Sequence, residues 1–197
     1  SDVTLDVDIW TVAAGIGAGA VNPATASADP KVYAYLDADS DVSATGAVTL
    51  SAGMTPKLTA NVWGVAAGGL AVGVSVTDID IAPVVAATLG DPEDSTAGDV
   101  TLSAGSLSLA AQSDLPGSGQ SAWVKSEGVA GALVGIDSTN ATIDNDSSVL
   151  AGIGDGATLS VGGAVAVSAE NQSRQAAEAN SAAGGGIAMG VASSTVR

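Results

Sequence analysis

The sequence predicts an all-β protein, a right-handed parallel β-helix (β-solenoid) of about nine or ten rungs. Three observations predict it: apolar and polar residues alternate with period two, short phrases recur in a fixed order, and the chain has 26 glycines but no phenylalanine. Small apolar side chains fill a core only where backbones approach closely, so the predicted core is thin. An antiparallel β-sandwich is the alternative, because alternating strands with Gly and Pro turns suit it as well.

Half-buried strands are predicted first at residues 2–9 and 99–104. Apolar residues alternate with polar ones in both, which turns one face of each strand toward a core. The phrase Val-Thr-Leu in these segments returns at residues 47–52, and a related phrase lies at residues 164–169. This recurrence indicates one repeated structural unit. The predicted inward residues of the two strands are Val3, Leu5, Val7, Ile9, Val100, Leu102 and Ala104.

A phrase rich in glycine and alanine forms the next predicted element. Its four copies are 53, 64 and 53 residues apart, counted from Val12, Val65, Val129 and Ala182. In the second copy the apolar residues change parity at Gly68 and Gly69, which predicts a bulge or corner where glycine makes it least costly. A second change of parity is predicted between Val76 and Ile79.

An acidic, turn-like phrase completes the unit, and the phrases keep the same order in each cycle. Four imperfect copies of this unit cover the chain, so residues 1–197 are predicted to be a single domain. Each copy divides into about three turns of roughly 18 to 22 residues, which leads to nine or ten rungs. Residues 169–183 have a helix-forming composition, but their register copies residues 103–129, so a strand is predicted there.

The repeats resemble those of a known family. Residues 143–169, followed by the Gly/Ala-rich residues 181–191, resemble the repeats of giant bacterial leukotoxin-type filamentous adhesins and haemagglutinin-like exoproteins. Residues 46–52 and 98–104, with their downstream Gly-Val-Ala segments, match as well. The resemblance implies a secreted β-helical stalk or adhesin at a bacterial cell surface, of which this chain is a fragment.

Charge and composition exclude several classes of function. The chain has 21 acidic and 5 basic residues, a formal net charge of −16, and neither cysteine nor histidine. Such an acidic surface repels nucleic-acid phosphates and anionic membranes, so neither is a predicted partner. The most apolar stretch, residues 62–76, is too short for a spanning helix, so no membrane insertion is predicted. Without thiols and imidazoles, most nucleophiles, bases and zinc ligands are missing, and no enzymatic activity is predicted.

No cofactor is predicted, and calcium is the one that the sequence leaves open. Asp37, Asp39 and Asp41 alternate as the first ligands of a calcium loop do, although the later Gly and bidentate Glu of an EF-hand are absent. These three residues are the candidate metal ligands. They, or Asp144 and Asp146, also form nominal carboxylate pairs for glycoside hydrolysis, but residues i and i+2 of a strand more often form a solvated stripe.

Two tryptophans occupy equivalent places in successive copies. Trp10 and Trp63 are 53 residues apart. They are predicted either to fill a corner of the alanine-rich core or to stack as an exposed aromatic ladder that contacts a partner or a sugar.

The predicted function is that of a structural or adhesive extracellular β-solenoid, as a stalk, adhesin segment or filament subunit without catalysis. Its predicted partners are further copies or neighbouring solenoid repeats, joined end to end through unpaired strand edges, and a cell-surface or glycan receptor. The alternative is a calcium-dependent carbohydrate-binding or carbohydrate-active β-helix module. Loss of thermal stability in a metal chelator favours the calcium module, whereas indifference favours the structural protein.

Overall fold

The described part of the protein consists of β-strands and connections. The computed structural model describes residues 1–94, 99–117 and 119–197. Residue 98, the first of the repeat segment 98–104 named above, lies outside the described residues. These residues contain no helix, and therefore none with the length and apolar character needed to cross a membrane. The prediction of an all-β chain is confirmed. The strands are β1 (Asp2–Ala28), β2 (Lys31–Leu36), β3 (Asp41–Ser43), β4 (Ala47–Ile81), β5 (Val84–Leu89), β6 (Thr101–Ala104), β7 (Ser106–Ser113), β8 (Ala122–Asn145), β9 (Ser148–Ile153), β10 (Thr158–Val161), β11 (Val165–Asn171), β12 (Gln175–Gly184) and β13 (Ile187–Val196).

Every pairing between the described strands is parallel. β4 lies between β1 and β8, while β12 and β13 pair along the other side of β8. Parallel neighbours need long connections, and here each connection is the remainder of a repeat. The alternative of an antiparallel β-sandwich is therefore wrong, whereas the strands predicted within residues 169–183 are confirmed as the end of β11 and most of β12.

Partner residues confirm the repeat that the sequence indicated. Val12 lies opposite Val65, Val65 opposite Val129, and Ala182 opposite Val129 from the other side. The steps between the four copies of the glycine-rich phrase are thus the offsets between paired strands. Two smaller sheets also pair equivalent strands of successive repeats in parallel. One is made of β2, β5 and β9, and the other of β3, β6 and β10.

The predicted count of nine or ten rungs is wrong. In the described residues the deepest stack of paired strands is four, namely β1, β4, β8 and β12, and no pairing joins residues only 18 to 22 positions apart. The reason is the length of the strands. β4 alone spans 35 residues, so the chain uses a whole repeat before it returns to the same ladder.

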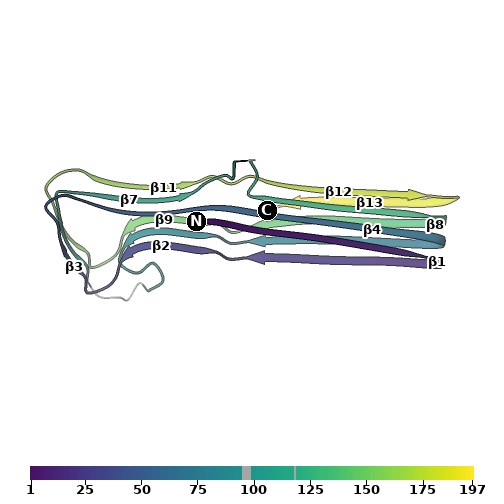
Figure 1. The fold of residues 1–197 in the computed structure, drawn as a ribbon, viewed down its shortest axis with the longest axis horizontal. Helices are drawn as coiled ribbons and strands as arrows, with labels where there is room; N and C mark the ends of the chain where they lie inside the picture. The colour runs from purple at the N-terminus through teal and green to yellow at the C-terminus, as the bar shows by residue number, and fades with distance from the viewer. Residues whose placement is uncertain (95–98, 118) are drawn as a thin grey trace.

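The long strands run to one end of the molecule, turn a corner and come back (Figure 1). We call the segments before the corner the outgoing arms and those after it the returning arms. The strands follow the longest axis of the molecule, and the ladders of backbone hydrogen bonds run across that axis. The outgoing arms are residues 2–14, 55–67, 122–131 and 175–184, and the returning arms are residues 18–28, 71–81, 134–145 and 187–196.

The corner of β4 lies where the parity of the sequence predicts it. The pairing of β1 with β4 skips Gly69, and the buried positions change from even numbers, ending at Ala66, to odd numbers, beginning at Ala71. Gly68 packs directly against the backbone of Gly15 in the neighbouring strand. A residue without a side chain is needed for this close approach.

Inward side chains of the two arms pack against each other and form the core. Leu58 and Ala60 of an outgoing arm share one buried cluster with Ile79 and Ile81 of a returning arm. Burial of each large side chain contributes about 1.5–3 kcal/mol, so this cluster holds the two layers together. The predicted inward residues Val100, Leu102 and Ala104 are buried in a second cluster beside the short strands.

The returning arm of β4 differs from its prediction. No second change of parity occurs, so Ser75 and Thr77 point inward and are buried. The apolar residues Val74 and Val76 lie on the outer face and are half-buried. Alternation identifies two faces but does not tell which one is inside.

Candidate functional site

A groove on the outer face of the outgoing arms is the candidate functional site. Its volume is about 360 Å³, within the range of roughly 300–1,000 Å³ that is common for ligand sites. Three tryptophans line it together with charged and amide side chains, a combination that offers both stacking and hydrogen bonding. The lining residues are Asp8, Trp10, Asn61, Val62, Trp63, Trp123, Lys125 and Glu127.

One wall of the groove is a pair of tryptophans whose tilted rings contact each other. Trp10 and Trp63 are partners in the register of β1 and β4, and their ring centroids are 4.5 Å apart with planes tilted by 58°. Trp10 is 69% exposed and Trp63 is 37% exposed. The prediction of an exposed aromatic ladder is therefore confirmed, and a place in a corner of the core is wrong.

Trp123 flanks the groove on its other side. It pairs with Thr59, which precedes Trp63 by four residues on the same face of the sheet. Four residues of strand span about 13 Å, so a floor of that width separates the tryptophan positions. The floor is the ladder position between them, where three polar residues lie in register: Asp8, Asn61 and Lys125.

Polar contacts hold the floor in place. Asn61 Nδ2 donates a hydrogen bond to Asp8 Oδ1 at 2.8 Å, and Lys125 Nζ forms an ion pair with Glu127 Oε1 at 3.0 Å. The hydrogen bond to Glu127 raises the pKa of Lys125, which keeps the ammonium group charged. Both carboxylates of the groove are thus already engaged.

The groove suits an uncharged ligand that has apolar and hydroxyl-bearing faces. Its own charges are one positive and two negative, and the whole chain carries −16, so an anionic ligand is repelled. Large aromatic rings bury apolar surface of a flat ligand, while the amide and charged groups bind its hydroxyl groups.

The candidate calcium ligands are not assembled into a metal site. Asp37 and Asp39 are exposed in the turn between β2 and β3, and Asp41 is exposed as the first residue of β3. Asp39 has a left-handed backbone with a φ of 59°. Asp37 Oδ1 accepts a hydrogen bond from the backbone N–H of Ala38. Across the described ranges, no three His, Cys, Asp or Glu side chains are grouped to hold a metal. Calcium at these residues stays a prediction.

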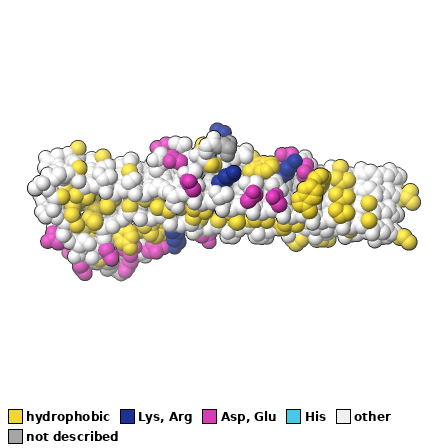
Figure 2. All heavy atoms as spheres, viewed as in Figure 1, with side chains coloured by type: hydrophobic (Ala, Val, Ile, Leu, Met, Phe, Trp, Pro, Cys, Tyr) yellow, Lys and Arg dark blue, Asp and Glu magenta, His cyan; other side chains and the backbone are white. Residues whose placement is uncertain are grey.

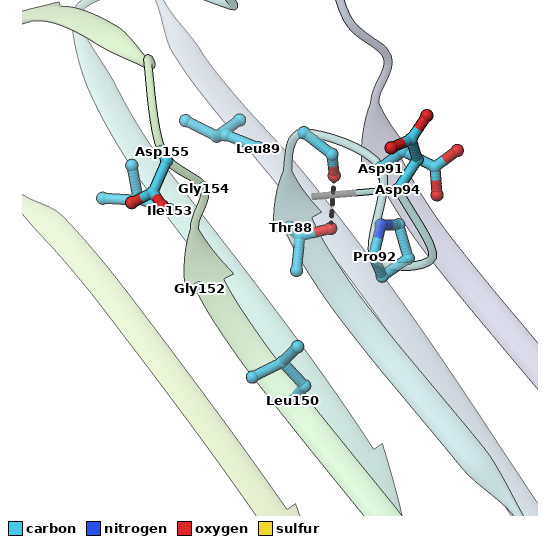
Figure 3. Close-up of a pocket in the computed structure, with 11 residues that line it drawn as sticks. Thr88, Leu89, Asp91, Pro92, Asp94, Leu150, Gly152, Ile153, Gly154 and Asp155 are labelled. Carbon is cyan, nitrogen blue, oxygen red and sulfur yellow. Dashed lines mark hydrogen bonds between the residues drawn. The ribbon is translucent and has the colours of Figure 1, made fainter. Parts of the chain in front are cut away.

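A second cavity of about 300 Å³ lies between the turn after β5 and the end of β9. Figure 3 shows Asp91 and Asp94 together on one rim, and Ile153 with Asp155 on the other. Thr88 Oγ1 donates a hydrogen bond to the Gly90 carbonyl at 2.8 Å, which fixes the turn. Acidic side chains gather at the end of the molecule that carries β3 (Figure 2), so this cavity belongs to an acidic region.

Beside this cavity the turn is tied to β2. Lys31 forms an ion pair with Glu93, and Tyr33 Oη donates a hydrogen bond to the same carboxylate at 3.1 Å. The hydrogen bond from Lys31, together with its positive charge and the bond from Tyr33, lowers the pKa of Glu93. These contacts are solvent-exposed, and they order the turn more than they stabilise the fold.

Comparisons with protein-family models, curated proteins and solved structures find no match for this chain. The tryptophan groove was only partly predictable, since the sequence singled out Trp10 and Trp63 but not Trp123 or Lys125. The signal was present, because the offset that pairs β4 with β8 places Trp123 on the same face as Trp63.

Proposed function

We propose that this protein is an extracellular structural and adhesive segment that binds uncharged glycans in the tryptophan groove. The observation that carries the proposal is the exposure of Trp10 and Trp63 beside the polar floor of Asp8, Asn61 and Lys125. Exposed tryptophans cost solubility, and apolar surface rimmed by polar groups marks a contact site. Sugars present both C–H faces and hydroxyl groups, which match this combination.

The binding is non-catalytic in this proposal. Hydrolysis of a glycoside needs two carboxyl groups that are free to act as acid and as nucleophile or base. In the groove, Asp8 accepts the hydrogen bond from Asn61, and Glu127 is paired with Lys125. Both acids therefore support the floor.

The scaffold in this proposal is a right-handed parallel β-solenoid in which one whole repeat of the sequence forms a single rung. The support is the register, which pairs each long strand with the equivalent strand of the next repeat. A bacterial cell surface is the proposed location, in line with the resemblance of the repeats to filamentous adhesins. The groove then lies on the flat side of a stalk.

End-to-end contacts with neighbouring repeats or copies belong to the same proposal. Among the described strands β1 pairs only with β4, and β12 and β13 pair only with β8, so one side of each offers backbone groups for a further strand. Electron microscopy of the purified chain at rising concentration is expected to show stacked particles. Particles of one constant size at every concentration would contradict this contact.

Binding to neutral oligosaccharides tests the groove. We expect at least one of cellohexaose, chitohexaose and mannohexaose to bind in isothermal titration calorimetry and to change the tryptophan fluorescence. Trp10→Ala and Trp63→Ala are each expected to weaken that binding about tenfold or more, because they remove the stacking surface.

An exposed aromatic residue elsewhere provides the control. Tyr35 lies on β2 outside the groove, so Tyr35→Ala is expected to leave the affinity unchanged. Absence of binding to all three sugars, or an equal loss in Tyr35→Ala, would sink the proposal. Tight binding of an anionic polysaccharide such as heparin would contradict the charge argument.

A further inference from the structure

A band of polar side chains crosses the core near the corner of the long strands. Asn22, Ser75 and Thr139 share one ladder position on three successive returning arms. Thr77 lies two residues after Ser75, and Asp137 two residues before Thr139. All five are buried. The band separates the cluster around Leu58, Ile79 and Ile143 from a second buried cluster at the corner. That cluster consists of Ala20, Ala66, Ala71 and Ala130.

Several polar atoms of this band have no partner among the described residues. They are both amide atoms of Asn22, the hydroxyl groups of Thr77 and Thr139, and both carboxylate oxygens of Asp137. By contrast, the buried Ser126 of an outgoing arm does have a partner, because its Oγ donates a hydrogen bond to the Ser75 carbonyl at 3.2 Å. An unsatisfied buried polar group costs about 1–3 kcal/mol, so a row of them implies a bound species.

Asp137 is the only acidic or basic residue in the buried core of the described chain. It is 0% exposed, and no basic side chain acts on its carboxyl group. Burial raises the pKa of Asp137. The Ser181 hydroxyl and the Ala182 backbone N–H approach the carboxylate without the geometry of full hydrogen bonds, and they offset part of that rise. A buried carboxyl group is either neutralised by a proton or balanced by a positive charge, and no basic side chain of the described residues provides that charge here.

Glycines make the space that the carboxylate occupies. A Cβ atom at Gly73 or at Gly128 would overlap Asp137 Oδ1. The positions equivalent to Asp137 in the neighbouring strands are Gly73 and Gly190, and Gly73 in turn pairs with Ala20. The fold itself therefore does not need a carboxylate at this ladder position, and an apolar residue would be the less costly choice.

We propose that the polar band binds a monovalent cation, Na⁺ or K⁺, at the carboxylate of Asp137. The hydroxyl oxygen of Thr139, two residues further along on the same buried face of β8, is the second ligand. Hard cations prefer oxygen ligands, and the unpartnered atoms of the band are mostly oxygens. One positive charge balances the single carboxylate, whereas calcium sites commonly gather several. Water molecules complete the coordination and accept hydrogen bonds from Asn22 Nδ2.

Thermal unfolding of the full chain in different chloride salts tests this site. The melting temperature is measured at equal ionic strength in sodium, potassium and tetramethylammonium chloride, the last being too large to enter the core. We expect a melting temperature at least about 5 °C higher in sodium or potassium than in tetramethylammonium. Asp137→Asn is expected to abolish that difference, and the sodium-23 resonance is expected to broaden with the parent chain but not with this variant.

Asp80→Asn is the matched control. It removes the same charge from the exposed face of β4, so its response to the three salts is expected to equal that of the parent. Thr139→Val keeps the carboxylate, is expected to reduce the difference between salts, and serves if Asp137→Asn does not fold. Equal melting temperatures of the parent chain in all three salts would overturn the cation site and indicate that a proton neutralises Asp137.

Discussion

We expect Gly68→Ala to unfold about 10 °C below the parent chain, because the added methyl group has no space at the corner of β4. A Cβ atom at Gly68 would overlap the carbonyl oxygen of Gly15 in the neighbouring strand. Backbone cannot move aside as a flexible side chain can, so the two strands must separate and lose hydrogen bonds. Overpacking of this kind costs about 3 kcal/mol, and each kcal/mol lowers the melting temperature of a chain of this size by about 2–4 °C.

The equivalent corner residue of β1 provides the control. Gly15 is the register partner of Gly68, but a Cβ atom there would approach only the Gly17 carbonyl oxygen, at an ordinary contact distance of 3.5 Å. Gly15→Ala is therefore expected to change the melting temperature by no more than about 2 °C. Similar melting temperatures for the two variants, measured by circular dichroism, would show that the corner has room for a methyl group at Gly68.

The second large effect is expected at the core between the arms. Leu58→Ala should lower the free energy of unfolding by about 2–5 kcal/mol, because Leu58 is 1% exposed and packs in the cluster with Ile79 and Ile81. Denaturant titration measures the change, and an unchanged m-value confirms that the same surface is exposed on unfolding.

The same strand offers the same substitution on its outer face. Leu70 is 50% exposed, so Leu70→Ala is expected to cost less than about 1 kcal/mol. If Leu70→Ala were as destabilising as Leu58→Ala, the assignment of inner and outer faces to β4 would be wrong. This pair therefore tests the parity of the outgoing arm and of the corner together.

The repeat and its corner could be predicted because both depend on local sequence. Val12 and Val65 have similar neighbours, and a pair of glycines marks the place where the strand turns. The size of the repeating turn could not be predicted, because similar short phrases also occur at other ladder positions. Residues 47–52 share letters with residues 2–6 but pair with residues 106–111.

The tryptophan groove could be predicted in part from the sequence, and the buried polar band could not. Equivalent positions of Trp10 and Trp63 followed from the repeat, and their exposure depended on which face of the arm lies outside. On the returning arms the apolar residues suggested the wrong inner face, since Val74 and Val76 are more hydrophobic than Ser75 and Thr77. On the returning arms the corner, and not hydrophobicity, determines which face points inward. The burial of Asp137 could therefore not be predicted from the sequence.

Because the strands are aligned with the longest axis, the resistance of the protein to an applied force depends on the direction of that force. A force along that axis loads the backbone hydrogen bonds of neighbouring strands in shear, so many of them must break at once. A force across the strands peels one strand from the next and breaks the bonds in succession. A surface contact at the tryptophan groove that is dragged parallel to the strands therefore meets the stiffest direction of the molecule.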